Sequence, residues 1–138
     1  MGLDTSHDCW HGSYSAFMVW RQKIASVAGY AVWDVKYDNG LIQKTVMIDW
    51  GHITENNLNG EWDVPQADPL IYLIAHSDCE GLIHPQQAAP LAKRLEELLS
   101  QLPDEDVAGH IGNWKSKTQK FIDGLNLAVK GVEDVIFH

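Results

Sequence analysis

The feature that most constrains the fold is a leucine stripe between two prolines. Between Pro85 and Pro103, leucines recur three and four residues apart, with charged residues between them. This spacing predicts an amphipathic helix from about Pro85 to Leu102. Because one face of such a helix must be buried, other elements of the chain must cover it. The stripe comprises Leu91, Leu95, Leu98, Leu99 and Leu102, and the solvent face comprises Lys93, Arg94, Glu96 and Glu97.

Three further segments are expected to be helical. Ser13 or Ser15 is a suitable cap for a helix that runs to about residue 28, where Gly29 is a suitable stop. Asp68-Pro69 predicts the start of a buried helix, because Asp is a favoured cap and Pro a favoured first residue. A last helix is predicted over roughly 113–130. Their inward positions are Phe17, Trp20, Ile24, Val27 and Ala28; Leu70, Ile71, Leu73 and Ile74; and Trp114, Phe121, Ile122, Leu125 and Val129.

A β-hairpin is expected in the first half of the chain. Residues 30–37 and 41–50 are rich in β-branched and aromatic side chains, and Asp38-Asn39-Gly40 lies between them. Asn-Gly is the strongest short hairpin signal. Residues 1–12 are expected to form a polar loop, residues 51–64 a long loop, and residues 132–137 a short terminal strand. The sequence therefore predicts one domain over residues 1–138, a mostly helical α+β fold of about four helices with a β-hairpin.

Composition excludes several classes of protein. The formal net charge of −9, from 10 basic and 19 acidic residues, argues against direct nucleic acid binding. It is compatible with solubility alone, a cation site, a basic protein partner or mimicry of nucleic acid. No apolar run is long enough to cross a membrane and no signal peptide is evident, so we expect a cytoplasmic protein. The two cysteines are expected to stay reduced, although a Cys9–Cys79 disulfide remains open.

Chemically capable side chains gather in two similar clusters. The first runs from His7 through Asp8, Cys9 and Trp10 to His11. The second, residues 76–81, contains His76, Asp78, Cys79 and Glu80. These side-chain types bind metals, move protons or attack electrophiles. We therefore expect the N-terminal segment to pack against the second cluster and form one polar site.

The second cluster has the outline of an EF-hand loop between two helices. With His76 at the first loop position, Asp78, Glu80, Gly81 and Ile83 match the third, fifth, sixth and eighth positions. His76 and Gln87 depart at the first and twelfth positions, where the pattern requires acidic ligands. A tight turn between helices, with Asp78 as a cap, explains the same residues. The central helix–loop–helix is therefore expected to be EF-hand-like but degenerate.

The donors in the two clusters also suit zinc or another divalent cation. The candidate metal ligands are His7, Cys9 and His11 from the first cluster and His76, Asp78, Cys79 and Glu80 from the second. A hydrogen-bonded network that pins the N-terminal segment is the alternative without a metal. A cysteine nucleophile activated by a nearby histidine is a further alternative.

The motifs carry a resemblance to one group of proteins. The resemblance is carried by four segments: residues 2–12 (GLDTSHDCWHG), residues 76–81 (HSDCEG), residues 121–125 (FIDGL) and residues 136–138 (IFH). The chain resembles, from end to end, an uncharacterised family of short phage and prophage proteins. No activity is attached to that family, so no functional residue can be transferred. The resemblance implies an accessory protein in the host cell cytoplasm that acts against host defences.

Three functions follow as hypotheses. The first is a protein that binds a nucleotide-like or phosphate-bearing small ligand in counter-defence. The second is a metal-dependent hydrolase of a small phosphoester, and the third is an acidic protein that binds a host protein. Whether the chain is an enzyme stays open, no catalytic residue is assigned, and the sequence does not indicate the oligomeric state. The candidate ligand-binding residues are His7, Asp8, Trp10, His11, His76 and Asp78.

Overall fold

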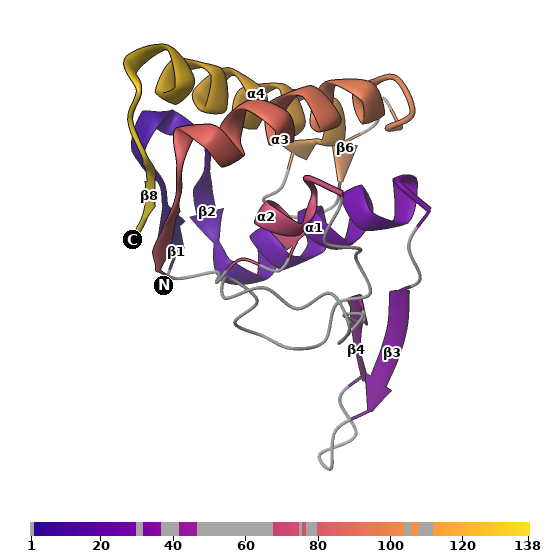
Figure 1. Ribbon diagram of the computed structural model, residues 1–138. Coiled ribbons are helices and arrows are strands. Elements are labelled where there is room, and N and C mark those ends of the chain that lie inside the picture. The colour runs from indigo at the N-terminus through magenta and orange to yellow at the C-terminus, as the bar shows by residue number, and fades with distance from the viewer. Residues whose placement is uncertain are drawn as a thin grey trace.

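The computed structural model describes residues 2–29, 32–36, 42–46, 68–74, 76, 80–103, 106–107 and 112–138. Over these residues the fold is mostly helical α+β, as predicted. The helices are α1 (Tyr14–Val27), α2 (Ile71–Ile74), α3 (Pro85–Leu99) and α4 (Trp114–Gly131). In Figure 1, α3 and α4 lie side by side as one layer, and α1 and the short α2 form a second layer.

The predicted helix boundaries are confirmed to within a few residues. Ser13 caps α1 by accepting a hydrogen bond from the Ala16 N–H at 3.1 Å, and Gly29 ends it with a left-handed φ of 94°. Asp68 accepts a hydrogen bond from the Leu70 N–H at 3.0 Å at the start of the α2 region. The backbone of His84 donates to the Gln87 side chain at 3.0 Å at the start of α3.

The hairpin is also confirmed where its strands are described. β3 (Val32–Lys36) and β4 (Ile42–Val46) pair antiparallel, from Val32↔Val46 to Lys36↔Ile42. The predicted Asp38-Asn39-Gly40 turn and the predicted loop at 51–64 lie outside the described residues.

The N-terminal residues are more ordered than predicted, and the expected polar loop is wrong for the residues described. β1 (Gly2–Asp4) pairs antiparallel with β2 (His11–Ser13), and the 3-10 turn η1 (Ser6–Asp8) lies between them. Each strand has only three residues, which is too short for alternation to be recognised in a sequence. A second pair, β6 (Asp106–Val107) with β7 (Gly112–Asn113), precedes α4.

The terminal strand joins the N-terminal pair to the centre of the chain. β8 (Val135–Phe137) pairs antiparallel with β5 (Gly81–Ile83). On its other side, Asp4 and His138 exchange two backbone hydrogen bonds of 2.9 Å, and Thr5 bridges Phe137. The four strands therefore lie in the order β2-β1-β8-β5, at the end of the molecule where both termini lie in Figure 1.

The core lies between the helical layers and the inner face of these strands. It contains a cluster of aromatic rings: the centroid of the Trp20 ring lies 5.1 Å from that of Trp10 and 4.9 Å from that of Phe121. The stripe residues Leu91, Leu95, Leu98 and Leu102 are buried, as predicted. Burying each such side chain contributes about 1.5–3 kcal/mol. No helix in the described part of the chain has both the length and the apolar character needed to cross a membrane.

Candidate functional site

The first polar cluster lies along α4 and the turn that follows it. η1 packs against this helix, so the cluster and the helix form one surface. We call this the α4 surface. The neighbouring pairs, in order along α4, are Trp10 with Lys117, Asp8 with Lys120, Cys9 with Gly124, and His7 with Glu133.

Cys9 is buried at the centre of this surface. It is a free thiol and is 1% exposed. Burial raises the pKa of the Cys9 thiol from 9.0 to about 12, with a smaller contribution from Asp8, while a hydrogen bond with Thr5 acts in the opposite direction. The thiolate is the reactive and metal-binding form of cysteine. The surroundings of Cys9 therefore favour packing over nucleophilic attack or metal binding.

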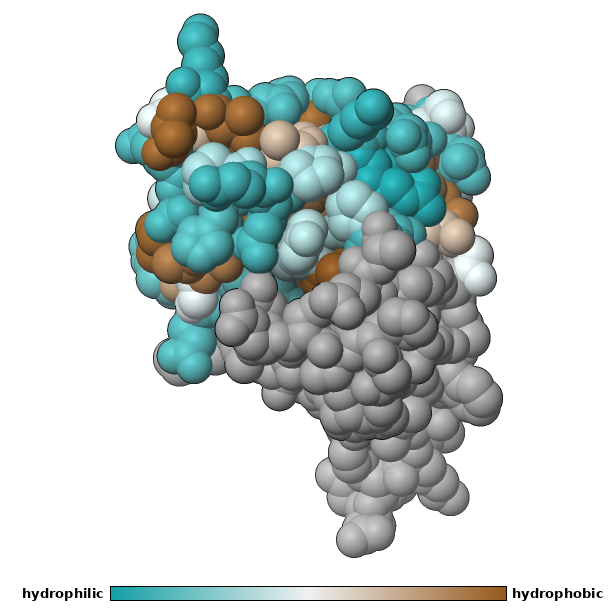
Figure 2. Space-filling view, viewed as in Figure 1, coloured by the Kyte–Doolittle hydropathy of each residue, from teal (hydrophilic) through white to brown (hydrophobic). Residues whose placement is uncertain are grey.

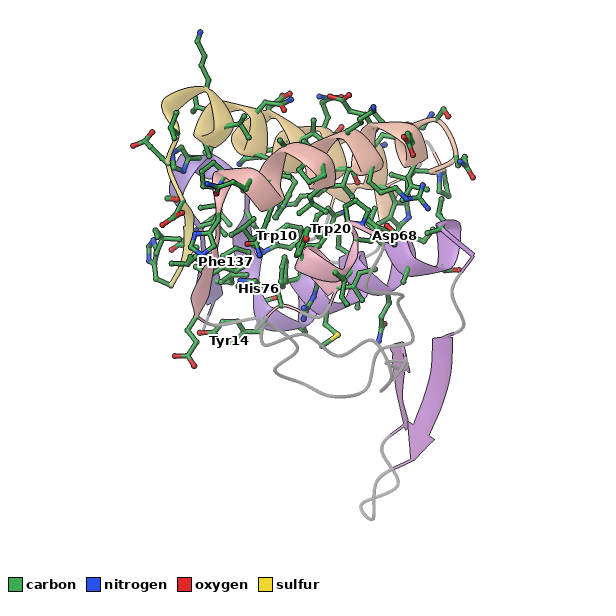
Figure 3. All side chains as sticks on the ribbon, viewed as in Figure 1. Trp10, Tyr14, Trp20, Asp68, His76 and Phe137 are labelled. Carbon is green, nitrogen blue, oxygen red and sulfur yellow. The ribbon has the colours of Figure 1, made fainter. Side chains whose placement is uncertain are left out.

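Trp10 is buried as well, and its ring is covered. The ring stacks on Trp20 and meets the edge of Phe17 at a centroid distance of 5.2 Å, and Lys117 Nζ lies 4.5 Å from its centroid. Figure 3 shows Trp10 and Trp20 together in the interior. Within the described residues, Trp10 Nε1 has no hydrogen-bond partner. The indole face is thus not presented to a ligand, although the sequence made Trp10 a candidate ligand-binding residue.

Two lysines lie at one end of this surface. Lys117 Nζ donates to the backbone carbonyl of His11 at 3.4 Å, and Lys120 Nζ lies 3.3 Å from Asp8 Oδ1. Burial lowers the pKa of Lys117, and Lys120 lowers it further, while Asp8 acts in the opposite direction. The His11 side chain is exposed and pairs through Nδ1 with the carboxylate of Asp4. His11 and Asp8 therefore flank the lysines at the edge of the surface.

His7 lies at the other end of the α4 surface, in a chain of hydrogen bonds. Its Nδ1 is 2.8 Å from Ser6 Oγ, and its Nε2 is 3.3 Å from Glu133 Oε1. The backbone N–H of Ile136 donates to Ser6 Oγ at 2.8 Å. The Glu133 side chain lies over Gly131, where an added Cβ would meet Glu133 Cδ at 3.1 Å.

Backbone strain concentrates at the same place. His7, Asp8 and Val132 have φ values of 59°, 56° and 53°. In the described part of the chain these are the non-glycine residues in the left-handed region. Such conformations cost roughly 1–3 kcal/mol each and tend to persist at functional sites. All three belong to, or directly adjoin, the His7–Glu133 pair.

The second cluster is described only in part. Asp78 and Cys79 lie outside the described residues. His76 is 7% exposed, its ring centroid lies 4.0 Å from that of Phe137, and its Nε2 is 3.0 Å from the Leu82 carbonyl oxygen. Figure 3 shows the two rings together beneath the strands. Glu80 is exposed.

The EF-hand outline differs from a calcium loop in two details. The candidate twelfth ligand, Gln87, accepts the His84 N–H with its side-chain oxygen at the start of α3. Gly81 has a φ of 99°, and an added Cβ there would lie 3.2 Å from His76 Cε1. Gly81 thus permits the close approach of the His76 ring, as the tight-turn interpretation requires.

The structure brings the two clusters to opposite edges of β8. Ser6 beside His7 bonds the backbone of Ile136, while His76 packs on Phe137 and the strand after it pairs with β8. Within the described ranges, no three His, Cys, Asp or Glu side chains group closely enough to hold a metal ion. The shared metal site with Asp78 and Cys79 stays a prediction.

Some residues of this surface were not expected from the sequence. Ser6, Lys117, Lys120 and Glu133 belong to it, and Glu133 is 126 positions from its partner His7. Only the fold brings such distant residues together. Near Glu133 the sequence offered one local indication of a turn, which was Gly131 followed two residues later by two acidic residues.

Comparison with known proteins gave no relative. No protein-family model, no curated protein and no solved structure matches this chain.

Proposed function

We propose that this protein binds a small phosphate-bearing ligand at the lysine end of the α4 surface. The carrying observation is the position of Lys117. Its ammonium group is partly withdrawn from water over the Trp10 ring, and its pKa is lowered. In the described residues no carboxylate lies within ion-pair distance of it.

An anion would relieve the cost of this arrangement. A partly desolvated cation is unfavourable until a counter-charge approaches it. Lys117 and Lys120 lie three residues apart on α4, and so on the same side of the helix, so a phosphate group between them would interact with both ammonium groups. Asp8 competes for Lys120 at 3.3 Å and would have to release it.

The ligand is recognised by its phosphate rather than by a base. Trp10 is buried against Trp20, so its ring is not a stacking platform. We therefore expect pyrophosphate to bind about as tightly as a nucleoside diphosphate. The proposal that ligand binding acts against host defences rests only on the resemblance to phage proteins.

Thermal unfolding with and without pyrophosphate tests this proposal. Stabilisation should rise with ligand concentration as RT ln(1 + [L]/Kd), and should weaken at high salt. Lys117→Met should abolish the shift and Lys120→Met should reduce it. Lys130→Met is the matched control, because Lys130 is exposed in the last turn of the same helix. No shift with pyrophosphate, or an equal shift in Lys117→Met, would contradict the proposal.

Binding should also depend on pH. An anion favours the charged form of Lys117, whose pKa is lowered in the free protein. Pyrophosphate binding should therefore take up protons near that pKa and weaken as the pH rises through it. Isothermal titration calorimetry in two buffers of different ionisation enthalpy measures the uptake, and Lys117→Met should remove it.

A further inference from the structure

The hydrogen bonds at His7 fit one arrangement of donors and acceptors among His7, Ser6 and Glu133. The Glu133 carboxylate can only accept, so His7 Nε2 carries the proton that points to it at 3.3 Å. In the neutral imidazole Nδ1 is then an acceptor, and the Ser6 hydroxyl is its donor at 2.8 Å. Ser6 Oγ in turn accepts from the Ile136 N–H. The Asp134 carbonyl, at 3.5 Å, is a more distant acceptor for the same hydroxyl.

This arrangement is the order of groups in an activated serine: a hydroxyl bonded to an imidazole, and the imidazole bonded to a carboxylate. The His7 side chain is 13% exposed, and Ser6 is partly exposed. The hydroxyl therefore combines a base within bonding distance with access to solvent. The hydroxyl and the imidazole come from a turn in which His7 and Asp8 hold left-handed backbone conformations, while Val132, beside Glu133, is left-handed as the C-cap of α4.

We propose that Ser6 is a nucleophile that cleaves small esters, with His7 as its base and Glu133 as the residue that positions the imidazole. His7 Nδ1 takes the proton of Ser6 Oγ as the oxygen bonds to the acyl carbon. The ester C–O bond breaks, and the leaving alcohol takes that proton from His7. Water then loses a proton to His7 and attacks the acyl carbon. The acyl–Oγ bond breaks, Oγ regains the proton, and a carboxylic acid is released.

The surface beside Ser6 favours an apolar acyl group. Ile136, whose backbone bonds Ser6 Oγ, is 42% exposed, and its register partner Leu82 is 37% exposed. Figure 2 shows hydrophobic surface beside β8 and over the C-terminal end of α4, with hydrophilic surface between them. Exposed apolar side chains beside a nucleophile suit a short aliphatic ester with a good leaving group.

Covalent labelling of the wild-type chain is the direct test. A fluorophosphonate probe should modify Ser6, as located by peptide mass spectrometry, and should leave the exposed Ser116 unmodified. p-Nitrophenyl butyrate should be hydrolysed with a rate that depends on pH. Modification confined to other serines, or no modification, would overturn the proposal without any variant having to fold.

Variants separate catalysis from a structural role. Ser6→Ala should remove hydrolysis, and Ser6→Cys should retain a nucleophile that alkylates faster than a free thiol. His7→Asn should lower kcat by roughly 10²–10⁴ and remove the pH dependence. Glu133→Gln should lower kcat with little change in KM, and the exposed Glu96→Gln should change neither. Equal kcat in wild type and Glu133→Gln, or an unchanged pH profile in a folded His7→Asn, would reject the assigned roles.

Discussion

The thiol of Cys9 occupies the space that a side chain at position 124 would need. At Gly124 an added Cβ would lie 2.8 Å from the His7 carbonyl oxygen and 3.0 Å from Cys9 Cα, and closer still to Cys9 Sγ. The strained turn of the first cluster thus rests directly on the backbone of α4. This contact positions both His7 and Trp10, so it determines the geometry of the whole α4 surface.

Gly124→Ala should therefore destabilise the protein, although alanine is the better helix former. Overpacking costs about 1–3 kcal/mol, which exceeds the gain of about 1 kcal/mol in helix propensity. Thermal or urea unfolding measures the difference. The exposed Asp123→Ala in the same helix should change stability little. Adding Cys9→Ala should recover part of the loss, because it removes the closest contact; strictly additive effects would show that this contact is not the cause.

Cys9 should be unreactive in the folded protein at neutral pH. The pKa of its thiol is about 12, so almost no thiolate is present, and the sulfur is buried. Ellman's reagent at pH 8 should detect Cys9 only after denaturation, with peptide mapping to separate it from Cys79. The metal content per chain should be the same in the wild type and in Cys9→Ala. Rapid native labelling of Cys9 would contradict this.

The same shift makes stability fall in alkali. In the unfolded chain the thiol ionises near its ordinary pKa of 9.0, while in the fold it stays protonated until about 12. The protonated thiol therefore contributes fully to the free energy of unfolding below pH 9. Between pH 9 and about 12 this contribution is lost, by about 1.4 kcal/mol per pH unit. Urea unfolding of the wild type and of Cys9→Ala over pH 8–10.5 checks this. The wild type should lose more stability with rising pH than the variant.

Arg21 should be more important for stability than the partly buried Arg94. It is fully buried, lies over the Phe17 ring and donates to the backbone carbonyls of Leu73, Ile74 and His76 at the end of α2. Arg21→Met leaves these carbonyls without that donor, and we expect a loss of about 3 kcal/mol or more. Arg94→Met is the comparison: the Arg94 side chain is 25% exposed and pairs with Asp68 and with the exposed Glu97, so its loss should cost less than that of Arg21. Equal losses would contradict the assignment.

Replacing Val132 with glycine should stabilise the protein. A β-branched residue in the left-handed region costs roughly 1–2 kcal/mol, and 79% of this side chain is exposed, so little packing is lost. We expect Val132→Gly to raise the unfolding temperature by several degrees. Val132→Ala removes the same side chain but retains a Cβ, and should gain less. If the strain serves Glu133, ester hydrolysis should fall in the glycine variant.

The helices and their buried faces could be predicted because periodicity and caps are local signals. Ser13, Gly29 and the Leu91 to Leu102 stripe act within a few residues of one another. The terminal strand β8 was expected, but the pairing of Asp4 with His138 could not be predicted, since a local pattern does not show which distant segment a strand pairs with. For the same reason the sequence singled out His7 but not Glu133, its partner after α4. His7 and Cys9 looked like joint ligands, yet His7 bonds Glu133 after α4 while Cys9 is buried against Gly124.

The position of β8 determines when the protein can finish folding during its synthesis. Ser6 bonds the backbone of a residue 130 positions later, and Asp4 pairs with His138. A nascent chain on the ribosome therefore keeps its N-terminal turn without these partners until Ile136 and His138 have been translated. Closing so long a loop is slow relative to forming local helices. The α4 surface should consequently be among the last parts of the protein to mature, and truncated chains would retain helices while lacking it.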